Sequence, residues 1–322
     1  MAISEKSPTV LGLDIGGTEI KSALVNFQGD IIASRRTPTP RSLPDFEQAL
    51  RNLIEHLNPE AVAIRAAGIG CKGIIDPGTT EVLALPGDLN YLEGRRLSEI
   101  IAPVVPAACP VAADNDARVA LVGECRWGAA RGRKNAIMLT LGTGLGGAIL
   151  AEGNIVRGAG GVAGHLGHIT VDPSGGVCMC GNRGCLQTVF SARAIESEAF
   201  AAIHNGAKTS LLQSSSRPPS CHEIFECARK GDKVARLIVE RAITFLGSAI
   251  AGLVHALDPE VVILGGNIAE AGDCLFEPIQ HEVDWRTWTL LRRKVPIVKA
   301  QVPDPSGVVG AAALAIDAAN LP

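Results

Sequence analysis

The strongest constraint on the fold is a motif that occurs twice, in which an apolar run is broken by a glycine turn and then resumes. The first copy is LGLDIGGTEIK at residues 11–21, and the second is LTLGTGLGGAIL at residues 139–150. Each copy predicts a strand, a tight turn and a second strand. Because the copies lie in successive halves of the chain, they favour a duplicated α/β domain.

Composition excludes several classes of protein. Glycine supplies 36 of 322 residues, but 47% hydrophobic residues are too many for a disordered Gly-rich chain. The formal charge of −3 gives no general footprint for nucleic acid or an anionic membrane. Aromatic residues are 3% of the chain, which disfavours recognition by stacking on rings. We therefore expect a polar small-molecule ligand that is held by hydrogen bonds.

The length favours two domains, and strands alternate with helices, so the predicted class is α/β. No secretory signal or membrane span is evident, and we expect a soluble cytoplasmic protein. Apolar runs and capping signals define the expected elements. The expected strands are 10–14, 20–26, 61–69, 136–141, 148–150, 261–264 and 297–302. The expected helices are 43–57, a helix capped at 114 or 115 and ending near 127, 191–203, 222–229, 232–257 and one beginning at 310.

The glycine turns are candidate phosphate sites. Backbone N–H groups bind phosphate well, and glycine permits close approach and the positive φ that turns these groups inward. Asp14 adds a carboxylate for Mg²⁺, and Thr18 and Lys21 add a hydroxyl and a cation. An ordinary hairpin turn is the alternative for any single pair of glycines. The candidate residues for a nucleotide's phosphate tail and Mg²⁺ are Asp14, Gly16, Gly17, Thr18, Lys21, Gly142, Thr143, Gly144, Gly265 and Gly266.

Three cysteines and a histidine lie within eighteen residues, among glycines that permit sharp reversals. Three thiolates and an imidazole complete a tetrahedral shell, which indicates structural rather than catalytic zinc. A loop of free cysteines is the alternative. The predicted ligands are His168, Cys178, Cys180 and Cys185.

Three consecutive polar residues, Asp114, Asn115 and Asp116, open a predicted helix. One of them could simply cap the helix while the others are solvated. The functional alternative is that Asp116 removes a proton from an attacking hydroxyl while Asn115 holds the substrate. Phosphoryl transfer needs little more, because its catalysis is mainly alignment and charge neutralisation.

Taken together, these motifs resemble the ROK family of sugar kinases and transcriptional repressors, within the actin-like ATPase superfamily. The resemblance also rests on GIGCKGIID at 68–76, AGHLGH at 163–168, CMCGNRGCL at 178–186 and ILGGNI at 263–268. It implies two actin-like (ribonuclease H-like) domains with a cleft between them. The small domain would be 1–116, with a C-terminal helix at 308–322 packing back on it. The large domain, 117–307, would carry the zinc site.

The resemblance further implies transfer of the γ-phosphoryl group from ATP–Mg²⁺ to a hexose hydroxyl, usually O6, with Asp116 as the general base. The implied sugar-site residues are Lys72, Gly73, Asn115, Asp116, His165, His168 and Gln187. Relatives are commonly dimers or tetramers, so a homodimer or homotetramer is expected. The repressor branch normally carries an N-terminal helix-turn-helix domain, for which a first strand at Val10 leaves no room.

The sequence departs from the family pattern where the sugar would lie. His165 and Gln187 stand where the family has Glu, Lys72 replaces a common Pro, and Arg118 replaces the second Asn of Asn-Asp-Ala-Asn. These changes remove acceptors for sugar hydroxyls and supply donors. Two acceptors remain open: a sugar with an extra acceptor group, such as an N-acetylhexosamine or a sugar acid, or plain glucose. A sugar-sensing protein without turnover is the rival function.

Overall fold

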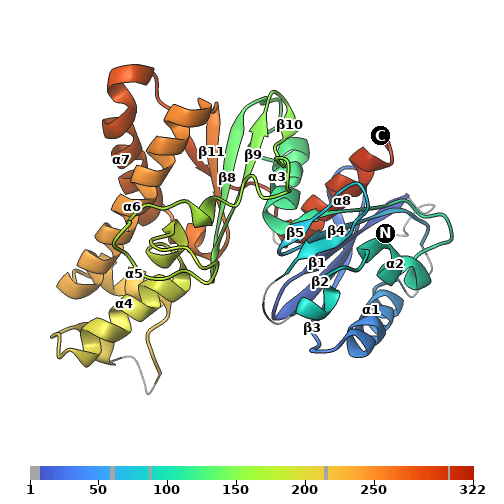
Figure 1. Cartoon of the computed structure of the whole chain (residues 1–322), viewed down its shortest axis with the longest axis horizontal. Coiled ribbons are helices and arrows are strands. Elements are labelled where there is room, and N and C mark those ends of the chain that lie inside the picture. The colour runs from blue at the N-terminus through green and yellow to red at the C-terminus, as the bar shows by residue number, and fades with distance from the viewer. Residues whose placement is uncertain (1–7, 59–61, 86, 88, 214–216, 304) are drawn as a thin grey trace, which may run out of the picture. The chain divides into compact units, whose positions relative to one another are not determined.

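The computed structural model describes residues 8–58, 62–85, 87, 89–213, 217–303 and 305–322. The chain forms two compact units (Figure 1). The first unit is Met1–Gly132, Arg157–Val162 and Gln301–Pro322, and the second is Arg133–Val156 and Ala163–Ala300. The division differs from the expected boundary between 116 and 117. The reason is that the helix after this boundary, α3, packs on the C-terminal helix α8 in the first unit.

The first unit contains a five-stranded sheet with the order β3-β2-β1-β4-β7. Its first three strands are antiparallel neighbours, and β4 and β7 extend it in parallel. The strands are β1 (Thr9–Ile15), β2 (Glu19–Val25), β3 (Ile31–Pro38), β4 (Ile64–Cys71) and β7 (Val111–Asn115). A separate two-stranded sheet pairs β5 (Ile74–Ile75) with β6 (Val82–Ala84).

Helices cover both faces of this sheet, because the strands alternate their side chains between two cores. Leu11 and Leu13 belong to the core that contains Phe46 and Leu50 of α1 (Leu43–Leu57), which has the predicted bounds. Val10 belongs to the core on α8. The other helices of this unit are α2 (Leu97–Ile101), α3 (Asp116–Trp127) and α8 (Ser306–Ala318), with 3₁₀ turns at Asn90–Leu92 and Ala102–Val104.

Glycines allow α8 to lie directly on the strands, as Figure 1 shows for the red helix beside the blue and cyan sheet. A Cβ added at Gly68 would lie 1.8 Å from the carbonyl oxygen of Ala311, and one at Gly12 would lie 2.0 Å from that of Val308. Neither distance is possible for a real Cβ. The missing side chains therefore set the depth at which α8 packs.

The second unit repeats the same topology, with the sheet order β10-β9-β8-β11-β12. Here too the first three strands are antiparallel neighbours, and the last two extend the sheet in parallel. The strands are β8 (Ala136–Leu141), β9 (Leu145–Ala151), β10 (Asn154–Ile155), β11 (Val261–Gly265) and β12 (Ile297–Lys299). The internal repeat predicted from the glycine turns is thus a repeat of a whole sheet, and the fold is α/β.

Four helices share one hydrophobic core with the second sheet. They are α4 (Ala192–His204), α5 (Cys221–Arg229), α6 (Lys233–Leu257) and α7 (Asp273–Leu291), with 3₁₀ turns at Leu166–His168, Leu186–Thr188, Ser210–Gln213 and Asn267–Ala271. By length and composition α6 could cross a membrane, but 56% of its most apolar window is buried in the protein, which is typical of a core helix. The sequence patterns did not predict α7, because Pro278 lies inside it.

Gly68→Ala tests the close packing of α8. The added methyl group would overlap the Ala311 carbonyl, so we expect a loss of about 1–3 kcal/mol in the free energy of unfolding, measured by chemical denaturation. The matched control is Gly252→Ala in α6, where no described heavy atom beyond the local helix lies within 4 Å of the new Cβ. The control should be neutral or stabilising by up to about 1 kcal/mol. Equal stability of both variants would contradict the packing argument.

Candidate functional site

In the first unit, the predicted site residues gather where the parallel strands β1, β4 and β7 end. Ile15 pairs with Cys71, and Cys71 pairs with Asn115, so the three carboxyl ends are level. This register brings together the residues at or just beyond these ends: Asp14, Lys72, Gly73, Asn115 and Asp116. Burial, and then the charges of Asp116 and Asp14, raise the pKa of the Cys71 thiol, because these surroundings disfavour a thiolate.

The turn at Gly16 and Gly17 is held firmly at the end of β1. The hydroxyl of Thr39 donates to the carbonyl of Gly16 at 2.7 Å, and the N–H of Thr39 donates to the carbonyl of Thr18 at 2.9 Å. Neither glycine adopts a positive φ, so the expectation of inward-turned N–H groups from such a φ is wrong here. What glycine provides is close approach, because neither residue has a side chain of its own.

Lys72 follows β4, and the end of its side chain lies against this same turn. A Cβ added at Gly17 would be 3.2 Å from the Lys72 ammonium nitrogen. Asp14 lies on the strand that enters the turn, and Lys21, its cross-strand partner on β2, is half-buried like Asp14. The turn therefore carries a carboxylate and two lysines, which suits a phosphate tail with a divalent cation.

Asn115 is the N-cap of α3. Its Oδ1 accepts the N–H of Ala117 at 3.1 Å, and its Nδ2 donates to the carbonyl of Gly73 at 3.0 Å. Gly73 has a φ of 93°, and a Cβ there would lie 2.4 Å from the Ala84 carbonyl oxygen, so its place needs glycine. Asn115 thus ties the end of β4 to the start of α3, as the capping alternative required.

Asp116 occupies the first position of α3 and is half-buried. Its Oδ1 accepts the N–H of Ala117 at 2.8 Å, which places the carboxylate at the positive end of the helix dipole. The backbone therefore holds this carboxylate at the start of α3, beside the carboxyl ends of β4 and β7.

A buried ion pair underlies the start of α3. The Asp114 carboxylate is fully buried and accepts from Nη1 of Arg118 at 3.1 Å and from Nε of Arg157 at 2.8 Å. Nη2 of Arg118 also donates to the carbonyl of Gly161. The Arg118 side chain is only 1% exposed, so it anchors the segment Arg157–Val162 to the first unit. It does not offer the donor to a substrate that we expected at this position.

In the second unit, the other predicted ATP residues also share one strand end. Gly265 pairs with Thr140, and a Cβ at Gly266 would lie 2.5 Å from the carbonyl oxygen of Leu141. Gly266 needs its φ of 84°, whereas Gly142 and Gly144 have no positive φ. Within the described residues, no heavy atom beyond its chain neighbours lies within 4 Å of a Cβ on Gly142. At Gly142, no described side chain covers the backbone of the β8–β9 turn.

The four predicted metal ligands come together in the second unit. One ligand atom from each of His168, Cys178, Cys180 and Cys185 lies within 4.8 Å of all the others. Sγ of Cys180 is 3.7 Å from Sγ of Cys185, and Sγ of Cys178 is 3.6 Å from Nδ1 of His168. Tetrahedral Zn²⁺ with bonds of about 2.3 Å to sulfur separates its sulfur ligands by roughly 3.8 Å. The cluster can hold such an ion.

The remaining predicted sugar residues adjoin this cluster. Nε2 of Gln187 donates to Sγ of Cys178 at 3.0 Å, and its Oε1 would lie 3.5 Å from a Cβ on Gly144. The rings of His165 and His168 are stacked with centroids 6.4 Å apart. Burial, with a smaller contribution from His165, lowers the pKa of His168, and the neutral imidazole is the form that binds metal.

Sequence reasoning missed three residues that shape the first-unit site. Thr39 holds the glycine turn, Arg157 completes the buried ion pair, and Gly307 leaves room for the carboxylate of Asp14. A Cβ at Gly307 would be 2.5 Å from Oδ2 of Asp14. Each residue is distant in sequence from the group that it supports, and no local pattern could have indicated it.

Arg118→Met tests the buried ion pair. Removal of one partner leaves the Asp114 charge buried with Arg157 only, so we expect a loss of about 3–5 kcal/mol in the free energy of unfolding by chemical denaturation. Arg126→Met is the control, because its partner Asp317 is half-exposed, and it should cost about 0–1 kcal/mol. A loss of less than about 1 kcal/mol for Arg118→Met would refute the role.

Comparison with known proteins agrees with this arrangement. The ROK family profile matches residues 10–318. A glucokinase from Halalkalibacterium halodurans is 32% identical over 311 residues, covering 93% of this chain and 92% of the relative. An N-acetylmannosamine kinase from Yersinia pseudotuberculosis is 33% identical over 305 residues, covering 94% and 96%. The crystal structure of a ROK family glucokinase from Streptomyces griseus with glucose and AMPPNP superposes with a TM-score of 0.81 at 32% identity, covering 96% of this chain and 99% of the other. The chain has the actin-like ATPase fold of such kinases, and it belongs to the ROK family.

Proposed function

We propose that this protein is an ATP-dependent sugar kinase that transfers the γ-phosphoryl group to a hexose or hexose-derivative hydroxyl, O6 being the expected position. The observation that carries the proposal is the meeting of Asp14, Lys72 and Asp116 at the level ends of β1, β4 and β7. The similarity to glucokinases and N-acetylmannosamine kinases supports it. Phosphoryl transfer requires the kinds of group that meet there: a metal-binding carboxylate, a cation and a base.

On the donor side, the glycine turns would bind phosphate oxygens through backbone N–H groups. Asp14 would hold Mg²⁺, since a hard cation prefers carboxylate oxygen, and the ion would neutralise charge on the phosphates. Lys72 was expected at the sugar, but its ammonium lies on the Gly17 turn. We therefore assign Lys72 to the transferred phosphoryl group, where a positive charge stabilises the negative charge of the transition state.

On the acceptor side, Asp116 would accept the proton of the attacking hydroxyl. A general base of this kind contributes typically 10²- to 10⁴-fold in rate. His165 and Gln187 offer donors where the family pattern has carboxylates. A donor suits the carbonyl oxygen of an N-acetyl group as well as a plain hydroxyl, so glucose and N-acetylhexosamines are both candidate acceptors.

We also propose that the cysteine and histidine cluster binds structural Zn²⁺. Its four ligands leave no open position, as structural sites require. Gln187 bonds to Cys178 and also reaches the β8–β9 turn, so the ion would fix a residue of the sugar site against a residue of the donor site.

Asp116→Asn tests the assignment of the base. We expect the turnover rate to fall at least about 10²-fold in a coupled ADP-release assay with glucose, N-acetylglucosamine and N-acetylmannosamine, while ATP affinity changes little. Asp45→Asn makes the same change in the first turn of α1, far along the chain from the site, and should leave turnover intact.

The outcomes separate the rival functions. An active Asp116→Asn variant would refute the role of the base, although the kinase assignment would stand. Binding of a sugar by the wild-type protein with no turnover of any sugar in the panel would instead indicate a sugar-sensing protein, and the kinase assignment would be wrong.

Removal of a cluster ligand tests the zinc site. Elemental analysis of purified protein should find one zinc per chain, and Cys185→Ser should lower both the zinc content and the thermal midpoint, because metal binding contributes to folding. Cys227→Ser, in the same unit but outside the cluster, should retain zinc. Clearly less than one zinc per wild-type chain would overturn the proposal.

A further inference from the structure

The segment Arg157–Val162 lies beside part of the predicted sugar site. It belongs to the first unit, although the residues before and after it belong to the second. A Cβ added at Gly161 would be 3.0 Å from Cγ2 of Ile74. The residue before Ile74 is Gly73, whose carbonyl accepts Nδ2 of Asn115 at 3.0 Å. The segment therefore borders two residues that we expect to hold the acceptor.

The first residue of this segment is an arginine whose position is fixed by a buried carboxylate. Nε of Arg157 donates to Oδ2 of Asp114 at 2.8 Å, and the Asp114 side chain is fully buried. The other oxygen, Oδ1, accepts Nη1 of Arg118 at 3.1 Å and the N–H of Asn115 at 2.8 Å. Because both oxygens are buried and bonded, the carboxylate cannot turn away, and it holds the Arg157 guanidinium next to Asn115.

The outer part of this guanidinium is open. The Arg157 side chain is 34% exposed, and in the part of the chain that the structure describes Nη1 and Nη2 have no hydrogen-bond or ion-pair partner. A guanidinium is planar, holds its N–H groups in a rigid fork and accepts no hydrogen bond. Arg157 therefore offers an oriented pair of donors, which the buried Arg118 does not.

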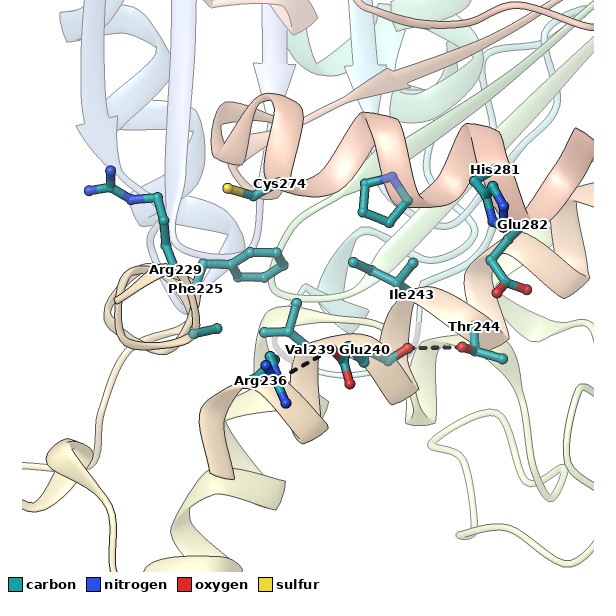
Figure 2. A pocket seen from close by; sticks show the side chains of 12 residues that line it. Phe225, Arg229, Arg236, Val239, Glu240, Ile243, Thr244, Cys274, His281 and Glu282 are labelled. Atoms are coloured by element: carbon teal, nitrogen blue, oxygen red, sulfur yellow. Dashed lines mark hydrogen bonds and ion pairs between the residues drawn. The ribbon is translucent and has the colours of Figure 1, made fainter. Parts of the chain in front are cut away.

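Two exposed arginines of the second unit lack such an orientation. A groove of about 360 Å³ between α5, α6 and α7 is lined by Arg229 and Arg236 (Figure 2). They pair with Glu226 and Glu240, whose side chains are themselves 35% and 59% exposed. Two long side chains in solvent pay entropy to hold one geometry, so such pairs orient their members weakly. The groove has no arginine that is fixed by a buried carboxylate, as Arg157 is.

An open fork of donors favours an acceptor sugar that carries a carbonyl group. A hydroxyl group both donates and accepts, whereas a carbonyl or carboxylate oxygen only accepts. Hydrogen bonds from a cationic donor are stronger than neutral ones, and a fork matches a planar acceptor through two parallel bonds. A plain hexose, with hydroxyl groups and a ring oxygen only, would gain less from Arg157.

We propose that Arg157 is a specificity-determining residue, whose Nη groups bind the carbonyl oxygen of a substituent on the acceptor sugar, such as an N-acetyl or a carboxylate group. The inference rests on the proposed function, because it concerns the acceptor of the same phosphoryl transfer. Arg157 holds a part of the sugar that does not react, while Asp116 takes the proton of the attacking hydroxyl. Such an interaction acts on the KM for the sugar more than on kcat.

Selectivity between acceptors tests the inference. A coupled ADP-release assay with the full-length protein gives kcat/KM for glucose, N-acetylglucosamine, N-acetylmannosamine and gluconate. The wild-type protein should prefer at least one carbonyl-bearing sugar to glucose. Arg157→Met should lower that preference at least about 10-fold, mainly through KM, because a hydrogen bond to a charged group is lost. Arg157→Lys keeps the charge and can still bond to Asp114, but it lacks the fork and should also lower the preference.

Arg118→Lys is the matched control, because Arg118 bonds to the same carboxylate from a buried position. It should lower the free energy of unfolding and leave the preference between sugars unchanged. Circular dichroism and the thermal midpoint show whether each variant is folded. A loss of packing slows turnover of all sugars alike, whereas a lost contact with the substituent changes the ratio between them.

The outcomes separate this inference from the proposed function. A wild-type preference for glucose over every carbonyl-bearing sugar, or a preference that both Arg157 variants retain, would overturn the inference and leave the kinase assignment intact. An equal change in Arg118→Lys would also overturn it. No turnover of any sugar would overturn the kinase assignment and the inference with it. Preference for gluconate would identify the carbonyl as a carboxylate, and preference for an N-acetylhexosamine would identify it as an amide.

Discussion

The parallel pairing of β1, β4 and β7 is the constraint on which the proposed catalytic site depends. Hydrogen bonds in these ladders set Ile15, Cys71 and Asn115 level with one another. Residues just beyond these strand ends therefore lie close to one another. A slip of one residue in β4 would move Lys72 off the Gly17 turn and turn every side chain of the strand to the other face.

Small residues and buried charges keep that register in place. Gly12 and Gly68 let α8 lie on the strands at a distance that no other residue permits, and α8 in turn presents Gly307 to the carboxylate of Asp14. At the end of β7, the ion pairs of Asp114 with Arg118 and Arg157 hold the start of α3 in place. They thereby hold Asp116, the first residue of this helix. The supports of the proposed site are thus closely packed, whereas Asp14, Lys72 and Asp116 are half-buried.

The two units use one topology for different tasks. Each unit has a glycine turn between its first two strands. In the first unit, the turn lies next to the carboxylate of Asp14. In the second unit, it lies next to Gln187, which bonds to Cys178 of the cysteine cluster. Repetition of the sheet topology gives each unit a glycine turn in the same place. The residues placed around each turn then decide which chemistry it supports.

The sequence alone determined the strands that flank each glycine turn, the bounds of α1, and the grouping of His168 with Cys178, Cys180 and Cys185, because these depend on local periodicity and short spacing. It did not predict α7, where Pro278 interrupts the pattern, or the surroundings of Arg118 and Lys72. Only the tertiary structure decided those, because Arg118 meets Gly161 across 43 residues and Lys72 meets Gly17 across 55. Local patterns specify which elements form, whereas packing and register decide which distant side chains share one environment.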